Sequence, residues 1–201
     1  MKKITFLFSI LCLFVLLGCT TELISNDEAS TNTKTNTDNV DYTVTENTVV
    51  DNQSSVNEEV CFTTNLIAGQ NHIAGTVTVE NDGENLIITY TTNGDWTIDA
   101  THLSIGGCDD GSIPTTGSGN PKIGHFEYRS THSDGVNRVV YTISLDDILE
   151  DYCFAAHAEV KGPTGGETAW AEGTEFSGNS WAMYVEAKLS DCDDDETPPP
   201  Y

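Results

Sequence analysis

The chain has 201 residues, of which 32 are Asp or Glu and only 8 are Lys or Arg, so its formal net charge is −24 at neutral pH. Binding to nucleic acid needs clustered Lys and Arg side chains, and an anionic membrane surface repels the same negative charge. The composition therefore excludes a nucleic-acid-binding protein and a protein that lies flat on a membrane. It is typical of an exported protein with a solvated acidic surface.

The N-terminal segment has the pattern of an export signal. Lys2 and Lys3 precede an apolar run over residues 4–17, which ends at Gly18 and Cys19. A basic start, a short apolar run and a small residue before the cleavage point are typical of a secretory signal peptide. The run is shorter than the roughly 20 apolar residues that a spanning helix needs, so an uncleaved membrane helix is the weaker alternative.

The junction Leu16-Leu17-Gly18-Cys19 resembles the lipobox of bacterial lipoproteins, although that family more often has a smaller or β-branched residue in place of Leu17. The resemblance implies removal of residues 1–18 as a signal peptide and attachment of lipid to Cys19, with fatty acyl chains such as palmitate. Several chains together anchor a protein stably, because each buried methylene contributes about 0.8 kcal/mol. Thr20 rather than Asp follows the cysteine, which favours the outer membrane of the cell envelope and leaves the leaflet open.

Residues 19–59 are expected to form a disordered tether. They are mostly Thr, Asn, Asp, Ser and Glu, with neither Gly nor Pro. Such a segment buries too little apolar area to offset the entropy of ordering it. As a random coil it would reach about 35 Å, which would hold a folded domain away from the membrane. The acidic and proline-rich residues 193–201 are likewise expected to be disordered or extended.

Residues 60–192 are expected to form one antiparallel β-sandwich of about seven to eight strands, with at most one short helix. Alternation of apolar and polar residues predicts strands over residues 73–80, 85–92, 96–105, 123–130, 136–145, 152–160 and 181–189. Asp82-Gly83 and Asp134-Gly135 predict hairpins, because the tight turns between antiparallel strands need positive φ. Ser144 begins a pattern similar to a capping box, which predicts one or two helical turns over residues 145–151.

Four cysteines follow Cys19, and an even number in an exported domain predicts two disulfides. Cys61 and Cys192 bracket the domain, whose ends are expected to lie close together, so these two are expected to pair. Cys108 and Cys153 would form the second disulfide, since the glycines before Cys108 allow close approach to a neighbouring strand. The alternatives are the other two connectivities and a zinc site, which the lack of a Cys-x-x-Cys pair disfavours.

Histidine and carboxylate side chains supply one candidate for metal chemistry. His102 and His157 lie within predicted strands, and Glu159 shares a face with His157 because residues two apart in a strand point the same way. These three could form the metal site of an exported enzyme that acts on envelope or extracellular polymers. Structural histidines are the simpler interpretation, and no cofactor is expected. Asp109-Asp110-Gly111 and residues 191–195 could bind Ca²⁺, but they lack the EF-hand spacing.

The densest aromatic segment covers residues 168–184 and points to ligand binding. Trp170, Glu172 and His157 are the candidate contacts, because an aromatic ring beside polar groups offers a pyranose both an apolar face and hydrogen-bond partners. The simpler interpretation is that Trp181 belongs to the hydrophobic core and that Trp170 packs at a corner. The chain has no Gly-x-Ser-x-Gly or other nucleophile motif, so no catalytic residue is assigned.

Short segments such as Gly94-Asp95-Trp96, Ala156-His157-Ala158 and Ala169-Trp170-Ala171 resemble exported bacterial β-domains without an assigned activity. The resemblance covers residues 68–188 and transfers no functional residue. The sequence therefore predicts an envelope protein that is held to the membrane by the lipid on Cys19. This protein would bind a glycan or a protein ligand without catalysis, and the metal-dependent exported enzyme is the alternative.

Overall fold

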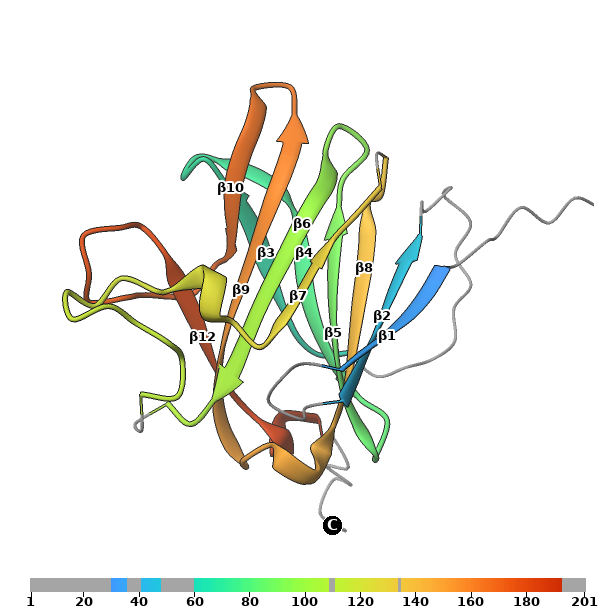
Figure 1. Ribbon diagram of the computed structural model, residues 1–201, viewed down its shortest axis with the longest axis vertical. Coiled ribbons are helices and arrows are strands. Elements are labelled where there is room, and N and C mark those ends of the chain that lie inside the picture. The colour runs from blue at the N-terminus through green and yellow to red at the C-terminus, as the bar shows by residue number, and fades with distance from the viewer. Residues whose placement is uncertain (1–29, 36–40, 48–59, 109–110, 134, 193–201) are drawn as a thin grey trace, which may run out of the picture.

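The computed structural model describes residues 30–35, 41–47, 60–108, 111–133 and 135–192, and it shows an all-β protein (Figure 1). Its strands are β1 (Ser30–Thr35), β2 (Asp41–Asn47), β3 (Val60–Ala68), β4 (His72–Asn81), β5 (Asn85–Thr92), β6 (Thr97–Gly106), β7 (Tyr128–Thr131), β8 (Arg138–Ser144), β9 (Asp151–Gly162), β10 (Gly165–Ala171), β11 (Thr174–Glu175) and β12 (Met183–Lys188). Three short 3₁₀-helices accompany them: η1 (Ile123–His125), η2 (Leu145–Asp147) and η3 (Leu189–Cys192). The predicted β-sandwich class is confirmed, although the described residues form twelve strands rather than seven or eight.

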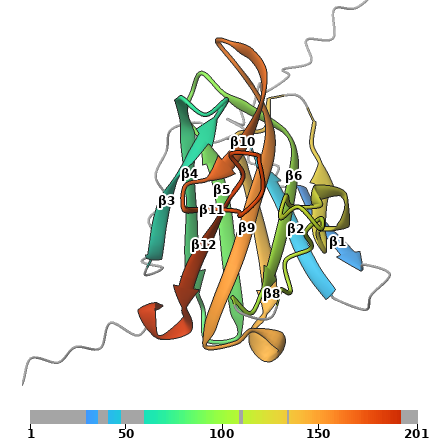
Figure 2. The same cartoon turned by 90° about the vertical axis from the view of Figure 1, so that its left-hand side faces the viewer.

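Two antiparallel layers make up the sandwich. One layer runs in the order β1-β2-β8-β5-β4-β3. The other contains β7, β6 and β9, with β10 and β12 along the far edge of β9. β10 also pairs with β3 and so connects the two layers. In Figure 1, β6, β7 and β9 cross in front of the first layer, and Figure 2 brings β10, β11 and β12 to the front.

The main core fills the space between the layers. Tyrosine rings form part of it. The ring of Tyr141 lies 5.9 Å from that of Tyr42 and 6.0 Å from that of Tyr90, measured between ring centroids. Burial raises the pKa of Tyr141 above its ordinary value. The Tyr141 hydroxyl is 2.7 Å from Thr101 Oγ1, which in turn is 2.7 Å from His132 Nε2. Its buried oxygen therefore has a hydrogen-bond partner, as buried polar groups require.

Strand β9 is buried on both faces, since residues 152–158 are all buried. Phe154 and Ala156 contribute to the main core, as the period of two predicts. Cys153 and Ala155 point the other way into a smaller cluster. This second cluster lies on the outer face of the second layer, where residues from loops 111–127 and 172–182 pack onto it. Its buried members are Ile113, Phe126, Cys153, Ala155, Trp170 and Ala182. Because these side chains fill the space under the loops, a binding site on this face can open to solvent only at the edge of the second cluster.

Residues 41–47 belong to the sandwich, so the prediction of a disordered tether over 19–59 is wrong for this segment. β2 pairs with β8 and also with β1, and Tyr42 and Val44 are buried in the core. The physical reason is that Tyr42 and Val44 alternate with threonines, which gives an apolar face and a high β-propensity. The predicted signal peptide and C-terminal tail lie outside the described residues, as does most of the remaining tether.

Two other predicted elements differ in detail. The strand expected over 123–130 is replaced by η1 followed by the short β7, because Phe126 N donates to Ile123 O at 3.1 Å and forms a local turn instead of a ladder bond. In the strand expected over 181–189, only residues 183–188 are extended. The predicted helix over 145–151 is confirmed as the single turn η2, where the Ser144 side chain accepts a hydrogen bond from Asp146 N.

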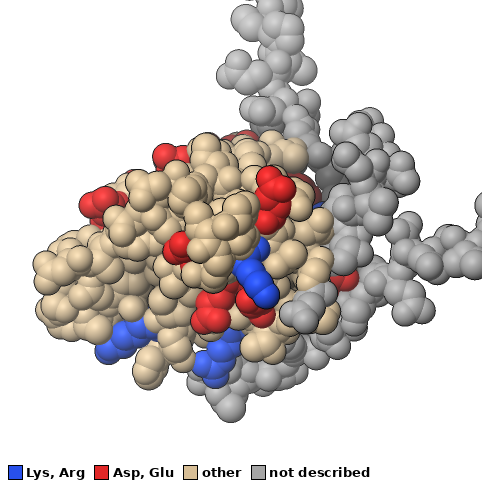
Figure 3. All heavy atoms as spheres, turned by 90° about the horizontal axis from the view of Figure 1, so that it is seen from above, with Lys and Arg blue, Asp and Glu red and all other residues tan. Residues whose placement is uncertain are grey.

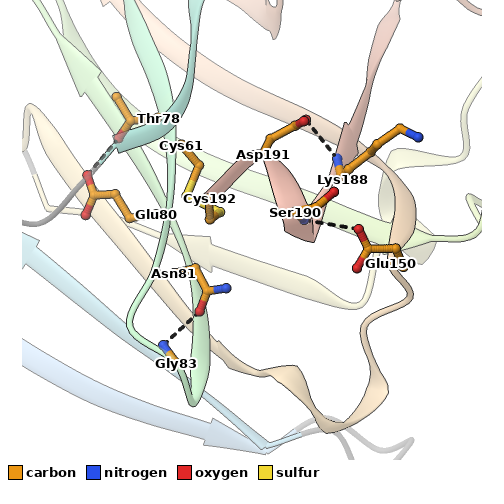
Figure 4. Close-up of a disulfide and its surroundings, with 10 residues drawn as sticks. All are labelled: Cys61, Thr78, Glu80, Asn81, Gly83, Glu150, Lys188, Ser190, Asp191 and Cys192. Atoms are coloured by element: carbon orange, nitrogen blue, oxygen red, sulfur yellow. Dashed lines mark hydrogen bonds between the residues drawn. A yellow bond between two sulfur atoms is a disulfide. The ribbon is translucent and has the colours of Figure 1, made fainter. Parts of the chain in front are cut away.

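Both predicted disulfides are confirmed. Cys61 of β3 is joined to Cys192 of η3 across 131 residues, and Cys108 is joined to Cys153 across 45 residues. Figure 4 shows the first disulfide at the point where η3 returns to β3. Disulfides of this kind persist in oxidising compartments. The Cys61–Cys192 disulfide therefore holds the two ends of the segment 60–192 next to each other.

Candidate functional site

The predicted site residues occupy one row across the second layer. His102 of β6 pairs with Arg129 of β7 and with His157 of β9, and His157 pairs in turn with Trp170 of β10. Directly paired residues of neighbouring strands point to the same face. The neighbours of His157 in the chain, Ala156 and Ala158, belong to the main core, so the whole row faces outward.

The two histidines of this row are in contact. His157 Nδ1 lies 3.3 Å from His102 Nδ1, and the ring centroids are 5.3 Å apart. Burial, and then the nearby His102, lowers the pKa of His157 to about 3. Burial also lowers the pKa of His102, although the Glu159 carboxylate partly opposes this. Both rings are therefore neutral at pH 7, and each keeps one nitrogen lone pair.

Trp170 and His157 are inside the protein. Trp170 is 4% exposed and His157 is 2% exposed. Their ring centroids are 4.7 Å apart, and Phe126 and Phe176 each pack 6.4 Å from Trp170. Two of the three predicted ligand contacts therefore lie beneath the loops that cover the second layer. Of the three, only Glu172 is at the surface.

Asn120 connects the two loops that form this cover. Its side-chain oxygen accepts hydrogen bonds from the backbone nitrogens of Asn179 and Ser180, at 2.9 and 3.0 Å. Gly178 is required next to it, because any β-carbon at that position would collide with the Asn120 side chain. The second loop, which carries Glu172, Phe176 and Trp181, is therefore held to the first by hydrogen bonds.

A groove of about 240 Å³ opens beside Glu172. This Trp181 groove is lined by Ile67, Gln70, Glu172, Glu175, Trp181 and Met183. The indole of Trp181 is only partly buried and rests on the second cluster. The Trp181 groove thus combines an aromatic face with carboxylate and amide groups, and its volume suits a small ring rather than a large ligand.

Hydrogen bonds hold the Glu172 carboxylate in place. Asn65 Nδ2 donates to Glu172 Oε2 at 2.6 Å, and Thr64 Oγ1 donates to the Glu172 carbonyl at 2.7 Å. The backbone nitrogen of Glu172 donates to the Asn65 carbonyl at 2.8 Å. A carboxylate fixed in this way is preorganised as a hydrogen-bond acceptor for a ligand.

Gln70 has an unusual backbone for its residue type. It is the one non-glycine residue with positive φ in the described part of the chain, at φ 69°. Gly69 and Gln70 form the tight turn between β3 and β4, and glycine adopts such angles without steric cost. Left-handed non-glycine residues concentrate at functional sites. Gln70 also lines the Trp181 groove.

Metal-binding groups are sparse in the described structure. Glu159 is exposed on the same face as the histidine pair, but within the described ranges no group of three His, Cys, Asp or Glu side chains could hold a metal ion. Asp109 and Asp110, which the sequence offered for Ca²⁺, lie outside the described residues. Asp191 instead accepts a hydrogen bond from Lys188 N at 3.2 Å. The metal-dependent enzyme therefore gains no support from this arrangement.

A second, larger groove of about 470 Å³ lies beside the Cys108–Cys153 disulfide. Its lining residues are Cys108, Asp151, Tyr184, Glu186, Ala187, Lys188 and Asp191. The Lys188 ammonium pairs with Asp151 at 2.9 Å, and both side chains are well exposed. Exposed ion pairs of this kind stabilise little. Tyr184 supplies an aromatic ring here and is partly buried like Trp181, but this groove also contains the exposed Lys188–Asp151 pair, whereas no Lys or Arg lines the Trp181 groove.

Charge is dispersed over the end of the sandwich seen from above. Acidic and basic side chains are scattered among uncharged residues there, and the described residues of this face form no continuous basic patch (Figure 3). In the part of the chain that the structure describes, no helix has the length and apolarity to cross a membrane.

Comparisons with protein-family models, characterised proteins and solved structures found no match. The class is thus defined by the fold alone: a disulfide-linked, all-β sandwich.

Sequence reasoning offered Trp170 as a candidate ligand contact and gave packing as the simpler interpretation of both tryptophans. Trp170 is buried, in agreement with the packing interpretation, whereas Trp181 is partly buried and lines a groove. Sequence reasoning also missed Gln70. The signal for Gln70 was Gly69-Gln70-Asn71 between two apolar runs, which is typical of a tight hairpin. Nothing in the sequence indicated that this turn would meet Trp181 and Glu172.

Proposed function

We propose that this protein is a lipid-anchored component of the cell envelope whose β-sandwich binds a glycan, without catalysis, in the Trp181 groove. The observation that carries the proposal is the partly exposed Trp181 indole beside the fixed carboxylate of Glu172. An aromatic face packs against the apolar C–H face of a sugar, while the carboxylate and the Gln70 amide accept and donate hydrogen bonds to its hydroxyls.

The charge of the groove restricts the class of glycan. Glu172 and Glu175 are the charged residues among those that line it, and neither Lys nor Arg is among them. A sugar that carries a carboxylate or sulfate would meet these two like charges, which disfavours its binding. We therefore expect neutral sugars to bind and acidic glycans to be rejected.

Replacement of Trp181 by alanine is expected to weaken glycan binding by at least tenfold, or about 1.4 kcal/mol, because the apolar face of the groove is lost. The measurement is a glycan array probed with the full-length protein, followed by titration calorimetry on the best neutral glycan. Leu149→Ala is the matched control, since Leu149 is an exposed apolar residue outside the groove. Binding to no glycan, or equal binding by wild type and Trp181→Ala, would contradict the proposal and favour a protein ligand.

The variant Gln70→Gly distinguishes an effect on glycan binding from an effect on stability, when binding and thermal unfolding are both measured. Glycine relieves the cost of positive φ, so the variant should unfold at a higher temperature, with a gain of about 1 kcal/mol. Loss of the amide should nevertheless weaken binding. A variant that is more stable and binds as well as wild type would show that Gln70 does not contact the ligand.

The proposed anchor has its own test. Cys19→Ser is expected to abolish lipid attachment and to leave the precursor uncleaved, because the cysteine sulfur is the nucleophile that receives the lipid in proteins with this junction. Metabolic labelling with a radioactive fatty acid, compared between wild type and variant, measures this directly. Cys12→Ser is the matched control, because Cys12 lies within the apolar run and precedes the proposed cleavage point. An unlabelled wild-type protein would overturn the anchor and leave the groove proposal unaffected.

A further inference from the structure

We propose that His102 and His157 bind one divalent transition-metal ion of the zinc or copper type through their Nδ1 atoms. The site is separate from the Trp181 groove and independent of the glycan proposal. It lies on the outer face of the second layer, where β6 and β9 are paired. Imidazole nitrogen is a preferred ligand for both metals.

The distance between the two nitrogens fits a shared ion. The separation of His157 Nδ1 and His102 Nδ1 is 3.3 Å. Two nitrogens bound to a tetrahedral ion at 2.0–2.1 Å are about 3.3 Å apart by simple trigonometry. When one Nδ1 carries a proton, the same contact is a hydrogen bond between the two rings, and a bound ion would take the place of that proton. The pair is therefore spaced as two ligands of one ion would be.

The backbone holds both rings in this arrangement before an ion arrives. His102 and His157 are direct partners in the β6–β9 ladder, which extends from residue 97 to residue 106 on β6. His157 is almost fully buried and packs against Trp170. His102 is only partly buried and leaves a path for an ion and its water. A preorganised pair with one open side is the geometry of an exchangeable metal site.

The second nitrogen of each ring stays available for a proton. Binding through both Nδ1 atoms leaves Nε2 to carry the proton of each imidazole. His157 Nε2 is buried and has no hydrogen-bond partner, which would normally be a costly arrangement. Its ring lies 4.7 Å from Trp170 by centroid distance.

Two charged side chains flank the histidine pair. Glu159 faces the same side of β9 and pairs with the small Ala100, so its carboxylate is free of a bulky cross-strand neighbour. Arg129 pairs with His102 on the other side and donates to the Gly124 carbonyl at 2.7 Å. Glu159 attracts a dication and Arg129 repels it. Because the described residues offer no third ligand within reach, water would complete the coordination.

The test is titration of Cu²⁺ into full-length protein that has been stripped with EDTA and dialysed. Tryptophan fluorescence should be quenched saturably because Trp170 contacts His157, and the electron paramagnetic resonance spectrum should show two coordinated nitrogens. His102→Ala should weaken the quenching site at least tenfold. His125→Ala is the matched control, because His125 is exposed and lies outside the pair. His102 is chosen over the buried His157 so that the variant folds, which its melting temperature verifies.

Arg129→Gln supplies an independent readout that removes no ligand. Loss of the positive charge should tighten Cu²⁺ binding by about twofold or more, since the charge lies within a Debye length of the ion. Unchanged or weaker binding in Arg129→Gln would contradict the placement of the ion beside His102. Equal affinity in wild type and His102→Ala, no saturable quenching, or a single coordinated nitrogen would overturn the proposal.

Discussion

Removal of the Cys61–Cys192 disulfide, as Cys61→Ala with Cys192→Ala, is expected to lower the free energy of unfolding by up to about 5 kcal/mol. The chain-entropy model gives this figure for a closed loop of this length, since the two cysteines are 131 residues apart. Without the cross-link, the unfolded chain gains conformational freedom. Such a loss is a large part of the 5–15 kcal/mol that typically stabilises a folded domain.

The other contacts of η3 replace this disulfide only in part. Lys188 N donates to Asp191 and Ser190 N to Glu150, both exposed to solvent (Figure 4), and net hydrogen-bond contributions of this kind are about 1 kcal/mol each. Leu189 N also donates to the Glu150 carbonyl at 2.9 Å, and the Leu189 side chain packs against the main core. The start of η3 should therefore stay in place once Cys192 is free, while its last residues lose their link to β3.

Urea unfolding of the double variant, followed by far-UV circular dichroism, measures the effect. The Cys108–Cys153 pair is the matched comparison, and the same model gives about 4 kcal/mol for its 45-residue separation. Cys153 is also almost fully buried, so its replacement adds a packing cost to that variant. An unfolding free energy within about 1 kcal/mol of wild type for Cys61→Ala with Cys192→Ala would contradict the entropic account.

Local alternation and turn chemistry were enough to predict the class of fold. Gly83 adopts positive φ at the predicted hairpin between β4 and β5, and β4, β5, β6, β8 and β9 lie where the period of two placed them. The second predicted hairpin, around Gly135, is wrong: Gly135 has positive φ, but β7 pairs with β6 while β8 pairs with β2 and β5, so the chain crosses between the layers there. The disulfide pairing was predictable because domain ends lie close together. These features depend on residues near each other in the sequence, or on a constraint that applies to whole domains.

The strands that the sequence did not predict receive their stability from partners far away along the chain. β10 pairs with β3 and β9, but its segment Gly165-Gly166-Glu167-Thr168 has low β-propensity. β2 has a clear apolar face only over Tyr42 and Val44, within a polar segment. Tertiary pairing overrides local propensity in both cases, and single-sequence reasoning has no access to that pairing.

The candidate site was predicted only in part, because a period of two assigns a residue to a face and does not say what covers that face. The alignment of His102, His157 and Trp170 on one face could be anticipated once β6, β9 and β10 were paired. The packing of the two loops over this face could not be anticipated. Asn120 fixes that cover through contacts some sixty residues away in sequence, and this cover buries Trp170 while it leaves Trp181 beside the groove.

Trp170→Ala is expected to destabilise the protein by about 3 to 5 kcal/mol, the usual cost of truncating a large buried aromatic residue. Trp170 is 4% exposed and forms ring contacts with Phe126, Phe176 and His157. Its removal would leave a cavity in the second cluster that the hydrogen-bonded loops cannot readily fill. Both the transfer of the indole to solvent and the residual cavity contribute to the loss.

Trp181→Ala is the matched comparison, because it makes the same chemical change at the other tryptophan that contacts the second cluster. Trp181 is only partly buried, so its truncation removes less apolar area from the folded state and should cost about 1 kcal/mol. Urea unfolding of both variants and of wild type at one pH gives the two differences directly. If Trp181→Ala were the more destabilising variant, Trp181 would be the core residue and the Trp181 groove could not bind a ligand as proposed. The expected order, with Trp170→Ala much less stable and Trp181→Ala near wild type, is what separates a packing role from a binding role for the two tryptophans.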